Sequence, residues 1–279
     1  MEPRPTSTRK EARAIHAERK AVLRGQLPYV AVNRSPGESN GSLLPGKTFD
    51  VATYNVHRWT GLAGGRRWNP ELAAEVIAEL DADVIAVQEA LRPFQSEDPL
   101  EWIADHLGLY LTFVSTRVHR LGELGNALFS RWPMSSVYMI DLTLSRLERR
   151  SAVVSEFNGE RRPLSIVATH LALLDRTRRR QVASILETER LQGPAVLLGD
   201  MNAWRQCPAS RSLDQEFMVL HDNLNWPPSF PSQRPVLALD RIYARDARVT
   251  SLRAHSTPAS RRASDHLPVL ATIELNGSR

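Results

Sequence analysis

Polar side chains that could do chemistry recur where apolar, strand-like segments of this 279-residue sequence end. Ligand-binding and catalytic groups collect at such strand ends in α/β sheets. Five segments show the pattern, YNVH, VQE, ATH, LLGDMN and SDH, and they carry Asn55 and His57, Glu89, His170, Asp200 and Asn202, and Asp265 and His266. We therefore expect these segments to converge on one site.

The residue types in these segments suit attack on a phosphorus centre. Carboxylate and amide oxygens are ligands that a hard cation such as Mg²⁺ accepts, and the cation polarises a phosphoryl oxygen or stabilises a leaving group. A further carboxylate can orient or deprotonate a water, while an amide or imidazole can stabilise charge on the phosphoryl oxygens. The set predicts metal-assisted hydrolysis of a phosphate ester.

The elements that must position these residues follow from the apolar runs. Residues 49–56 and 81–90 predict strands, and the charged segment 69–80 between them predicts a helix. A second helix is expected at 175–191, and further strands are expected at 109–114, 126–130, 135–140, 151–157, 164–170, 195–200, 237–245, 248–255 and 266–275. Several strands with few helices between them favour an α/β (α+β) sandwich with mixed sheets over a doubly wound fold.

Composition limits the class of protein. Hydrophobic residues at 42% and charged residues at 24% are ordinary for a globular protein and exclude wholesale disorder. The single cysteine, Cys207, excludes a disulfide framework and a cysteine-based metal site. No run of 18 apolar residues exists, and the charged N-terminus lacks the apolar region of a secretory signal. We therefore expect a cytoplasmic protein, and a monomer.

The positive charge is concentrated at the N-terminus. Residues 1–47 hold nine Lys and Arg against four acidic residues, whereas the remainder holds 27 of each sign. With the Pro-, Gly- and Ser-rich stretch 25–46, this predicts a basic, flexible extension over 1–47 and one catalytic domain over 48–279. The neutral body argues mildly against a polyanionic duplex as substrate, although local clustering of arginines would supply the basic groove that a nuclease needs. The extension is either a solubilising tail or a peripheral contact with anionic lipid.

Six short motifs, taken in their order along the chain, indicate a known family. Y-N-V-H, Q-E, T-H-L, G-D-M-N, L-D-R-I and S-D-H-L-P together resemble the endonuclease/exonuclease/phosphatase superfamily, from Phe49 to about Leu275. Its members include pancreatic-type deoxyribonucleases, abasic-site endonucleases and neutral sphingomyelinases, which are metal-dependent phosphohydrolases. The resemblance implies a four-layer sandwich of two packed mixed β-sheets flanked by helices, with one active site at their shared edge.

The resemblance also implies a metal site. Glu89 would be the principal ligand of Mg²⁺, or of Mn²⁺ as the alternative, with Asn55 and Asp265 beside it; Asp265 would also position the ring of His266. One residue departs from the pattern, because His57 stands where some nucleases of the family carry a metal-binding aspartate. Imidazole suits softer metals than Mg²⁺. We therefore do not expect a second metal there, and His57 is a candidate for binding substrate phosphate.

The catalytic roles follow from the same resemblance. Asp200 would orient and activate the attacking water, Asn202 would bind phosphate oxygens, and His266 would donate to the scissile phosphate. His170 matches a histidine that contacts phosphate or assists the leaving group. Asp240 matches an acid whose role differs among branches of the family. The implied reaction is a single attack by water without a covalent enzyme intermediate.

Other polar and aromatic residues have less certain roles. Arg66 and Arg67 lie in a Gly-rich loop and are candidates for substrate phosphate, whereas the arginine run at 176–181 is expected to be a solvated helix face. Trp59, Trp68 and Trp204 flank the motifs and either contact a base or lipid or belong to the core.

Two classes of function are compatible with this sequence. The first is a hydrolase of a phosphodiester or phosphomonoester, acting on nucleic acid or on a phospholipid or small phosphodiester. The second is a non-catalytic binding module on the same fold. Such a module should lack at least one of the central motif residues, and none is missing among Glu89, Asp200, Asn202, Asp265 and His266. The sequence therefore favours the enzyme.

Overall fold

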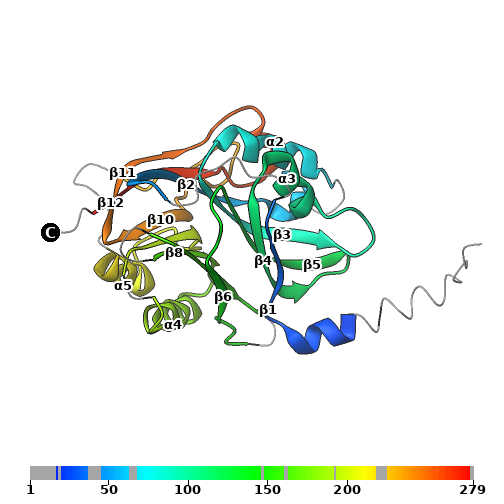
Figure 1. The fold of residues 1–279 in the computed structure, drawn as a ribbon, viewed down its shortest axis with the longest axis horizontal. Coiled ribbons are helices and arrows are strands. Elements are labelled where there is room, and N and C mark those ends of the chain that lie inside the picture. Colours follow the sequence, from blue (N-terminus) through cyan, green and yellow to red (C-terminus); the bar gives the residue numbers. More distant parts are fainter. Residues whose placement is uncertain are drawn as a thin grey trace, which may run out of the picture.

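Two β-sheets pack face to face with helices on both outer sides in the computed structural model (Figure 1). It describes residues 17, 20–36, 45–62, 68–145, 148–159, 163–191, 193–217 and 225–276. The strands are β1 (Tyr29–Arg34), β2 (Thr48–Asn55), β3 (Val84–Pro93), β4 (Tyr110–Val118), β5 (Gly122–Ser130), β6 (Ser136–Asp141), β7 (Ser151–Phe157), β8 (Leu164–His170), β9 (Ala195–Asp200), β10 (Asp240–Arg245), β11 (Ala247–Ala254) and β12 (Val269–Leu275). The helices are α2 (Pro70–Leu80), α3 (Pro99–Leu107), α4 (Asp175–Leu186), α5 (Pro208–Glu216), α6 (Ser260–Ala263) and the 3₁₀ turn η1 (His57–Trp59).

Both sheets are mixed. The larger has the order β1-β4-β5-β3-β2-β12-β11 and the smaller has the order β10-β9-β8-β7-β6. In the larger sheet β2 and β3 are parallel, and in the smaller β8 and β9 are parallel, while the neighbouring pairs are antiparallel. This confirms the predicted sandwich of two packed mixed sheets flanked by helices.

Three apolar layers hold the sandwich together. The inner faces of the two sheets meet in a core to which Val84, Val196 and Ile242 belong. A second core, under α2, α3 and α6, fills the outer face of the larger sheet, and a third lies under α4 and α5 on the smaller one. Burial of apolar area drives folding. The apolar residues along each strand therefore fix its position, and with it the position of the polar residues at its end.

Helix α2 shows how local sequence sets an element. Its N-cap Asn69 accepts a hydrogen bond from the Leu72 amide at 3.0 Å, and Pro70 occupies the first turn, where it loses no hydrogen bond. Val76, Ile77 and other apolar residues are buried on one face of the helix. The helix ends at Asp81 in the left-handed conformation, with φ of 47°.

The predicted N-terminal extension is wrong for residues 29–34. They form β1, which pairs antiparallel with β4 at the edge of the larger sheet. Arg149 Nη1 also donates to the Leu27 carbonyl at 2.8 Å, so the segment before β1 contacts the folded body. A short alternating strand between turn-rich stretches gives a weak pattern, which explains the miss. Residues 1–16, 18–19 and 37–44 lie outside the described part, and for them the extension remains a prediction.

Two short helices, α3 and α5, were also not predicted. Asp98 and Pro99 begin α3 with a side-chain cap and an N-terminal proline, a signal that was available in the sequence. Pro208 marks the start of α5 in the same way. The helix predicted at 175–191 ends earlier, at Leu186. Among the described residues, no helix is long and apolar enough to cross a membrane.

Candidate active site

Three neighbouring strands of the smaller sheet bring three of the predicted residues to one level. In the pairing register, His170 at the end of β8 lies opposite Asp200 at the end of β9, and Asp240 at the start of β10 lies opposite Asp200 from the other side. Asn55 ends β2 of the larger sheet and donates from Nδ2 to Asp200 Oδ2 at 3.1 Å. The two sheets therefore contribute to one buried polar cluster.

Gly199 allows β8 and β9 to approach closely beside this cluster. Its φ is +149°, and a Cβ atom there would lie 1.8 Å from the Thr169 carbonyl oxygen. A larger residue would push apart the two strands that carry His170 and Asp200. The glycine of the G-D-M-N motif thus has a structural role in placing the aspartate next to it.

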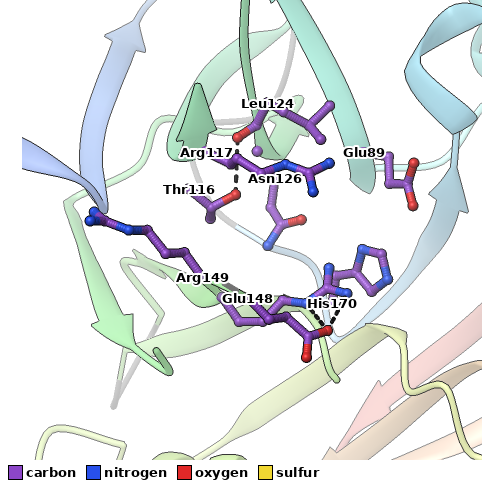
Figure 2. Close-up of a pocket in the computed structure, with 10 residues that line it drawn as sticks. Glu89, Thr116, Arg117, Leu124, Asn126, Glu148, Arg149 and His170 are labelled. Atoms are coloured by element: carbon purple, nitrogen blue, oxygen red, sulfur yellow. Dashed lines mark hydrogen bonds and ion pairs between the residues drawn. The ribbon is translucent and has the colours of Figure 1, made fainter. Parts of the chain in front are cut away.

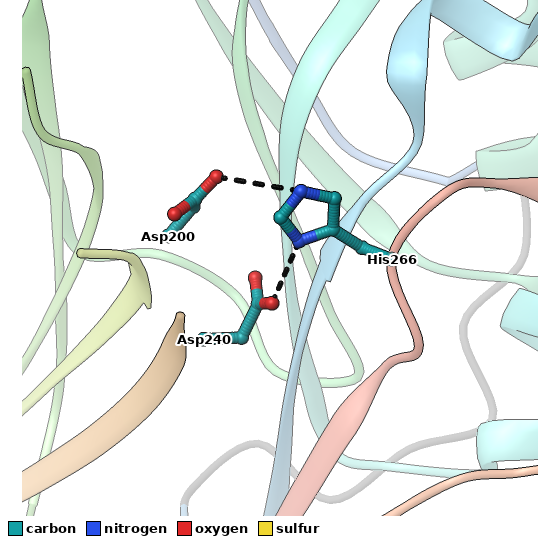
Figure 3. A group of neighbouring side chains, drawn as sticks. All are labelled: Asp200, Asp240 and His266. Atoms are coloured by element: carbon teal, nitrogen blue, oxygen red, sulfur yellow. Dashed lines mark hydrogen bonds and ion pairs between the residues drawn. The ribbon is translucent and has the colours of Figure 1, made fainter. Parts of the chain in front are cut away.

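His266 lies between two aspartates (Figure 3). Its Nδ1 donates to Asp240 Oδ2 at 2.8 Å, and its Nε2 lies 3.8 Å from Asp200 Oδ2. Ser229 Oγ donates to the same oxygen of Asp240 at 2.6 Å. The expectation that Asp265 positions the ring of His266 is therefore wrong: Asp240, which is far from His266 in sequence but faces it across the site, does so.

Burial and charge set the protonation states of this group. Burial alone disfavours a charged imidazole, but the Asp240 carboxylate, assisted by Asp200 and Asp265, raises the pKa of His266 to about 10. Burial raises the pKa of Asp200 to about 6, against the opposing effect of the His266 charge. Burial, together with the positive charges of Arg150 and His266, lowers the pKa of His170 well below its usual range. At neutral pH the Asp200 side chain is therefore ionised, the His266 ring is cationic and the His170 ring is neutral.

Asp200 is held rigidly. Its Oδ1 accepts the Asn202 amide at 2.9 Å, and its Oδ2 accepts Asn55 Nδ2 and lies 3.5 Å from His170 Nε2. Asn202 has a left-handed backbone with φ of 51°, and its Nδ2 donates to the Leu171 carbonyl at 2.9 Å. A fixed carboxylate with a raised pKa, adjacent to a cationic imidazole, can take a proton from water while the imidazolium donates one hydrogen bond.

Arg178 fixes the backbone of this site and was missed by the sequence analysis. The run 176–181 was expected to be solvated, but the Arg178 side chain is buried. Its guanidinium donates to the carbonyls of Ala172 at 3.0 Å and Leu173 at 3.1 Å. It also donates to the carbonyl of Asn202 at 2.8 Å. Arg178 is one of several arginines on the same helix, and only the direction of its side chain in the folded protein distinguishes it from the others.

Replacing Arg178 with methionine will destabilise the protein by about 3 kcal/mol or more, because two buried carbonyls and a third, half-buried one lose their donor. Turnover will also fall, by about tenfold, since the backbone that carries Asn202 is no longer fixed. Urea denaturation and steady-state kinetics measure the two effects. The matched control is Arg179→Met, an exposed neighbour, expected within about 0.5 kcal/mol of the wild type. Equal stabilities for the two variants would contradict the proposed role.

Glu89 lies apart from the buried cluster, on an irregular part of β3. The pairing with β5 shifts between Val87 and Ala90, and Glu89 has φ of 53°, as at a bulge that redirects a side chain. Its carboxylate is about one quarter exposed, and Arg58 Nε lies 3.6 Å from it. The Glu89 carboxylate is thus accessible to a bound ligand at the edge of the site.

Asp265 and His57 form the second part of this edge. His57 Nδ1 lies 3.0 Å from the Gly61 carbonyl oxygen and 3.4 Å from Asp265 Oδ1, while Arg58 Nη2 donates to His57 Nε2 at 2.6 Å. Asn55 Oδ1 accepts the His57 amide at 3.0 Å. Both ring nitrogens of His57 are therefore engaged with the protein, which does not favour a direct role for this ring in binding phosphate.

Two sets of side chains are candidates for binding a divalent cation. Asp200, Asp240 and His266 place ligand atoms within 4.8 Å of one another, but His266 already donates to Asp240 and carries a proton, so it is a poor ligand. Asn55, Glu89 and Asp265 offer only oxygens, the donors that Mg²⁺ prefers. The cationic Arg58 lies next to the Glu89 carboxylate, and the His57 ring lies next to the Asp265 carboxylate. This second set fits the hard cation that the sequence predicted.

A pocket of about 150 Å³ opens beside the cluster (Figure 2). Glu89 and His170 line one part of it, and Arg117, Arg149 and Arg150 line the rest together with Asn126 and other residues. Arg150 is paired with Glu148 at 3.0 Å. The surplus of arginines makes the pocket suitable for an anionic group. No motif in the sequence indicated any of the three.

The remaining sequence predictions fall elsewhere. Arg66 and Arg67 lie outside the described residues. Trp59 is fully buried in the core, where its Nε1 donates to the Leu91 carbonyl at 2.7 Å, whereas Trp68 and Trp204 are exposed. The question of core or surface is thus answered differently for the three tryptophans.

Comparison with known proteins shows what this arrangement is similar to. A profile of the endonuclease/exonuclease/phosphatase family matches residues 53–266. The uncharacterized protein YbhP of Escherichia coli K12 is 28% identical over 250 residues, which is 82% of this chain and 97% of YbhP.

Solved structures share the fold. An endonuclease/exonuclease/phosphatase from Beutenbergia cavernae superposes with a TM-score of 0.66 at 21% identity, over 82% of this chain and 72% of that one. TDP2 from D. rerio, complexed with a single-strand DNA product, superposes with a TM-score of 0.61 at 13% identity, over 82% and 99%.

Proposed function

Because the chain belongs to the endonuclease/exonuclease/phosphatase family, we propose that it is a metal-dependent hydrolase that cleaves a phosphate ester by direct attack of water. Family membership supports phosphoester hydrolysis in general. The observation that carries the proposal further is the buried group in which His266 lies between Asp240 and Asp200. It combines a proton acceptor and a proton donor at one place.

The proposed roles follow from the protonation states. Asp200 is ionised above pH 6 and accepts the proton of the attacking water, which it also orients. His266, kept cationic by Asp240, donates a hydrogen bond to a phosphoryl oxygen and stabilises the charge that develops there. Asn202, whose backbone Arg178 holds in place, binds the phosphate oxygens. His170 is neutral and lies against Asp200, where it can donate to the ester or the leaving group.

Asn55, Glu89 and Asp265 would hold the cation, Mg²⁺ or Mn²⁺, which supplies Lewis-acid polarisation when bound. The anionic part of the substrate beyond the scissile bond would lie in the arginine-lined pocket, with Arg117 as its main counter-charge, since Arg150 is paired with Glu148. An ester with a second phosphate or a carboxylate near the scissile bond fits this pocket better than a neutral one. The substrate class is therefore an anionic phosphodiester or phosphomonoester.

The test is turnover of purified protein on bis-p-nitrophenyl phosphate, p-nitrophenyl phosphate, supercoiled DNA, single-stranded RNA and phospholipid vesicles. We expect activity on at least one of them that is lost in a chelator and restored by Mg²⁺ or Mn²⁺. An Asp200→Asn variant serves as the blank. If neither the wild type nor the blank turns over any substrate, and both are folded, the non-catalytic binding module is favoured. If both are equally active, the activity comes from a contaminant.

Glu89→Gln will raise the Mg²⁺ concentration needed for half-maximal activity by about tenfold or more, because a charged ligand is replaced by a neutral one. A Mg²⁺ titration of turnover measures this. The control is Glu71→Gln on the exposed face of α2, for which no change is expected. An unchanged half-saturating concentration in Glu89→Gln would remove Glu89 from the metal site.

We further propose a monomer in the cytoplasm, as the sequence predicts. Light scattering coupled to size exclusion tests the first point, and fractionation of cells that express the protein tests the second. A dimer in solution, or recovery outside the cytoplasmic and membrane-peripheral fractions, would overturn the corresponding proposal.

A further inference from the structure

Large apolar side chains are exposed around the active site more than elsewhere. Ten such residues are exposed in the described part of the chain. Six of them lie on loops that follow β2, β8 or β9 or precede β10, which are the strands that carry the site: Leu62, Trp68, Leu173, Leu174, Trp204 and Val236. Singly exposed apolar residues need no explanation, but their concentration on the loops next to the strands of the site does.

Four of these residues form what we call the apolar rim: Leu173, Leu174, Trp204 and Val236, which are 60%, 68%, 56% and 67% exposed. Hydrogen bonds fix the rim to the site. Arg178 joins the Leu173 carbonyl to the carbonyl of Asn202, two residues before Trp204. One buried side chain therefore holds together the backbone at Leu173 and the backbone that leads to Trp204.

Val236 is tied to the other side of the same site. Its amide donates to the Phe230 carbonyl at 3.0 Å, and the Phe230 ring lies 4.9 Å from the ring of His266, centroid to centroid. Rim residues thus flank both the Asp200 and the His266 side of the cluster. Anything that contacts the rim lies next to the proposed site of hydrolysis.

Each part of the rim has an arginine within two residues. Arg176 follows Leu174, Arg205 follows Trp204, and Arg234 precedes Val236; all three are exposed. Within the described ranges none of the three forms an ion pair with a carboxylate, and the nearby Asp175 pairs with Arg178 instead. Apolar tips with unpaired cations beside them are complementary to a surface that has an apolar interior and an anionic exterior.

We propose that the apolar rim docks on an anionic phospholipid membrane. Leucine, valine and tryptophan side chains would enter the boundary between headgroups and acyl chains, while the three arginines would contact the anionic headgroups. Three of the four rim residues are aliphatic and cannot stack on bases, which favours lipid over single-stranded nucleic acid. Docking presents a lipid-borne phosphate ester to the site, and this consequence, unlike docking itself, rests on the proposed function.

The experiment is co-sedimentation of the full chain with phosphatidylcholine vesicles, with and without phosphatidylserine. We expect binding that requires phosphatidylserine and weakens with salt. The triple variant Leu173→Asp, Leu174→Asp, Trp204→Asp should partition at least about tenfold less, since apolar area is lost and like charges face the lipid. Trp102→Asp on α3, an exposed tryptophan away from these loops, is the matched control and should bind as the wild type does.

Hydrolysis of soluble bis-p-nitrophenyl phosphate separates docking from catalysis. If that activity is present in both the wild type and the rim variant, the variant is folded and the vesicle result stands by itself; if the wild type lacks it, only the proposed function fails. No binding to anionic vesicles overturns the docking proposal. Equal binding by wild type and rim variant also overturns it, as does loss of binding in Val22→Asp of the N-terminal segment instead. Trp204-dependent binding of a single-stranded oligonucleotide without vesicle binding would assign the rim to nucleic acid.

Discussion

Replacing Asp200 with asparagine is expected to lower turnover by about 10³- to 10⁴-fold, the largest effect predicted for any single residue of this protein. The amide keeps the size of the side chain but cannot accept the proton of the attacking water. The Asp200 carboxylate is buried and has a pKa raised to about 6, so it is ionised yet basic at neutral pH. Its two oxygens are held by the Asn202 amide and by Asn55, so a water cannot find an equivalent base by a small rearrangement.

The measurement is kcat on the substrate that the panel identifies, with thermal unfolding to confirm that the variant is folded. Asp141→Asn is the control, because Asp141 ends β6 of the same sheet and is exposed. Full activity is expected for it. If Asp200→Asn retained more than about one tenth of the wild-type rate, a loss smaller than general-base catalysis supplies, another group would be the base.

Asp240→Asn is expected to move the alkaline limb of the pH profile toward neutral pH and to lower turnover by about 10²- to 10³-fold. In the wild type, activity should rise as Asp200 loses its proton, with a pKa of about 6, and should fall as His266 loses its proton, with a pKa of about 10. Removing the Asp240 charge leaves burial, which lowers the pKa of His266, as the main influence. The imidazole then loses its proton at lower pH, and its donated hydrogen bond loses strength.

The measurement is the pH dependence of kcat/KM, with imidazole resonances observed by NMR as a readout independent of turnover. Ser229→Ala is the control, because it removes the other hydrogen bond to Asp240 Oδ2 but leaves the charge. It should leave the alkaline limb where it is. A limb that moved in Asp265→Asn but not in Asp240→Asn would restore the pairing that the sequence suggested and contradict the structure.

Many elements of the fold follow from local sequence patterns. The apolar runs around Val84, Ile166 and Val196 indicate strands because buried strands of a sandwich need apolar side chains along most of their length. Asn69 and Pro70 mark the start of α2 through the hydrogen-bonding needs of a helix end. By contrast, β1 has few buried residues and depends on its pairing with β4, so its own sequence indicates it weakly.

The family, the sandwich of mixed sheets and the polar strand ends can all be predicted from the sequence, because residue types, their order and apolar periodicity are local properties of the chain. Which polar groups contact one another depends instead on how the whole chain folds. Asp265 is adjacent to His266 in sequence, yet Asp240 binds the ring, because the segment before β10 is joined to the loop that carries His266, for example by the hydrogen bond from the Leu267 amide to the Ser229 carbonyl. In the same way Arg178 differs from Arg179 only in the face of α4 that it occupies. Contacts between distant segments depend on the packing of the whole sandwich, and no local sequence pattern predicts them.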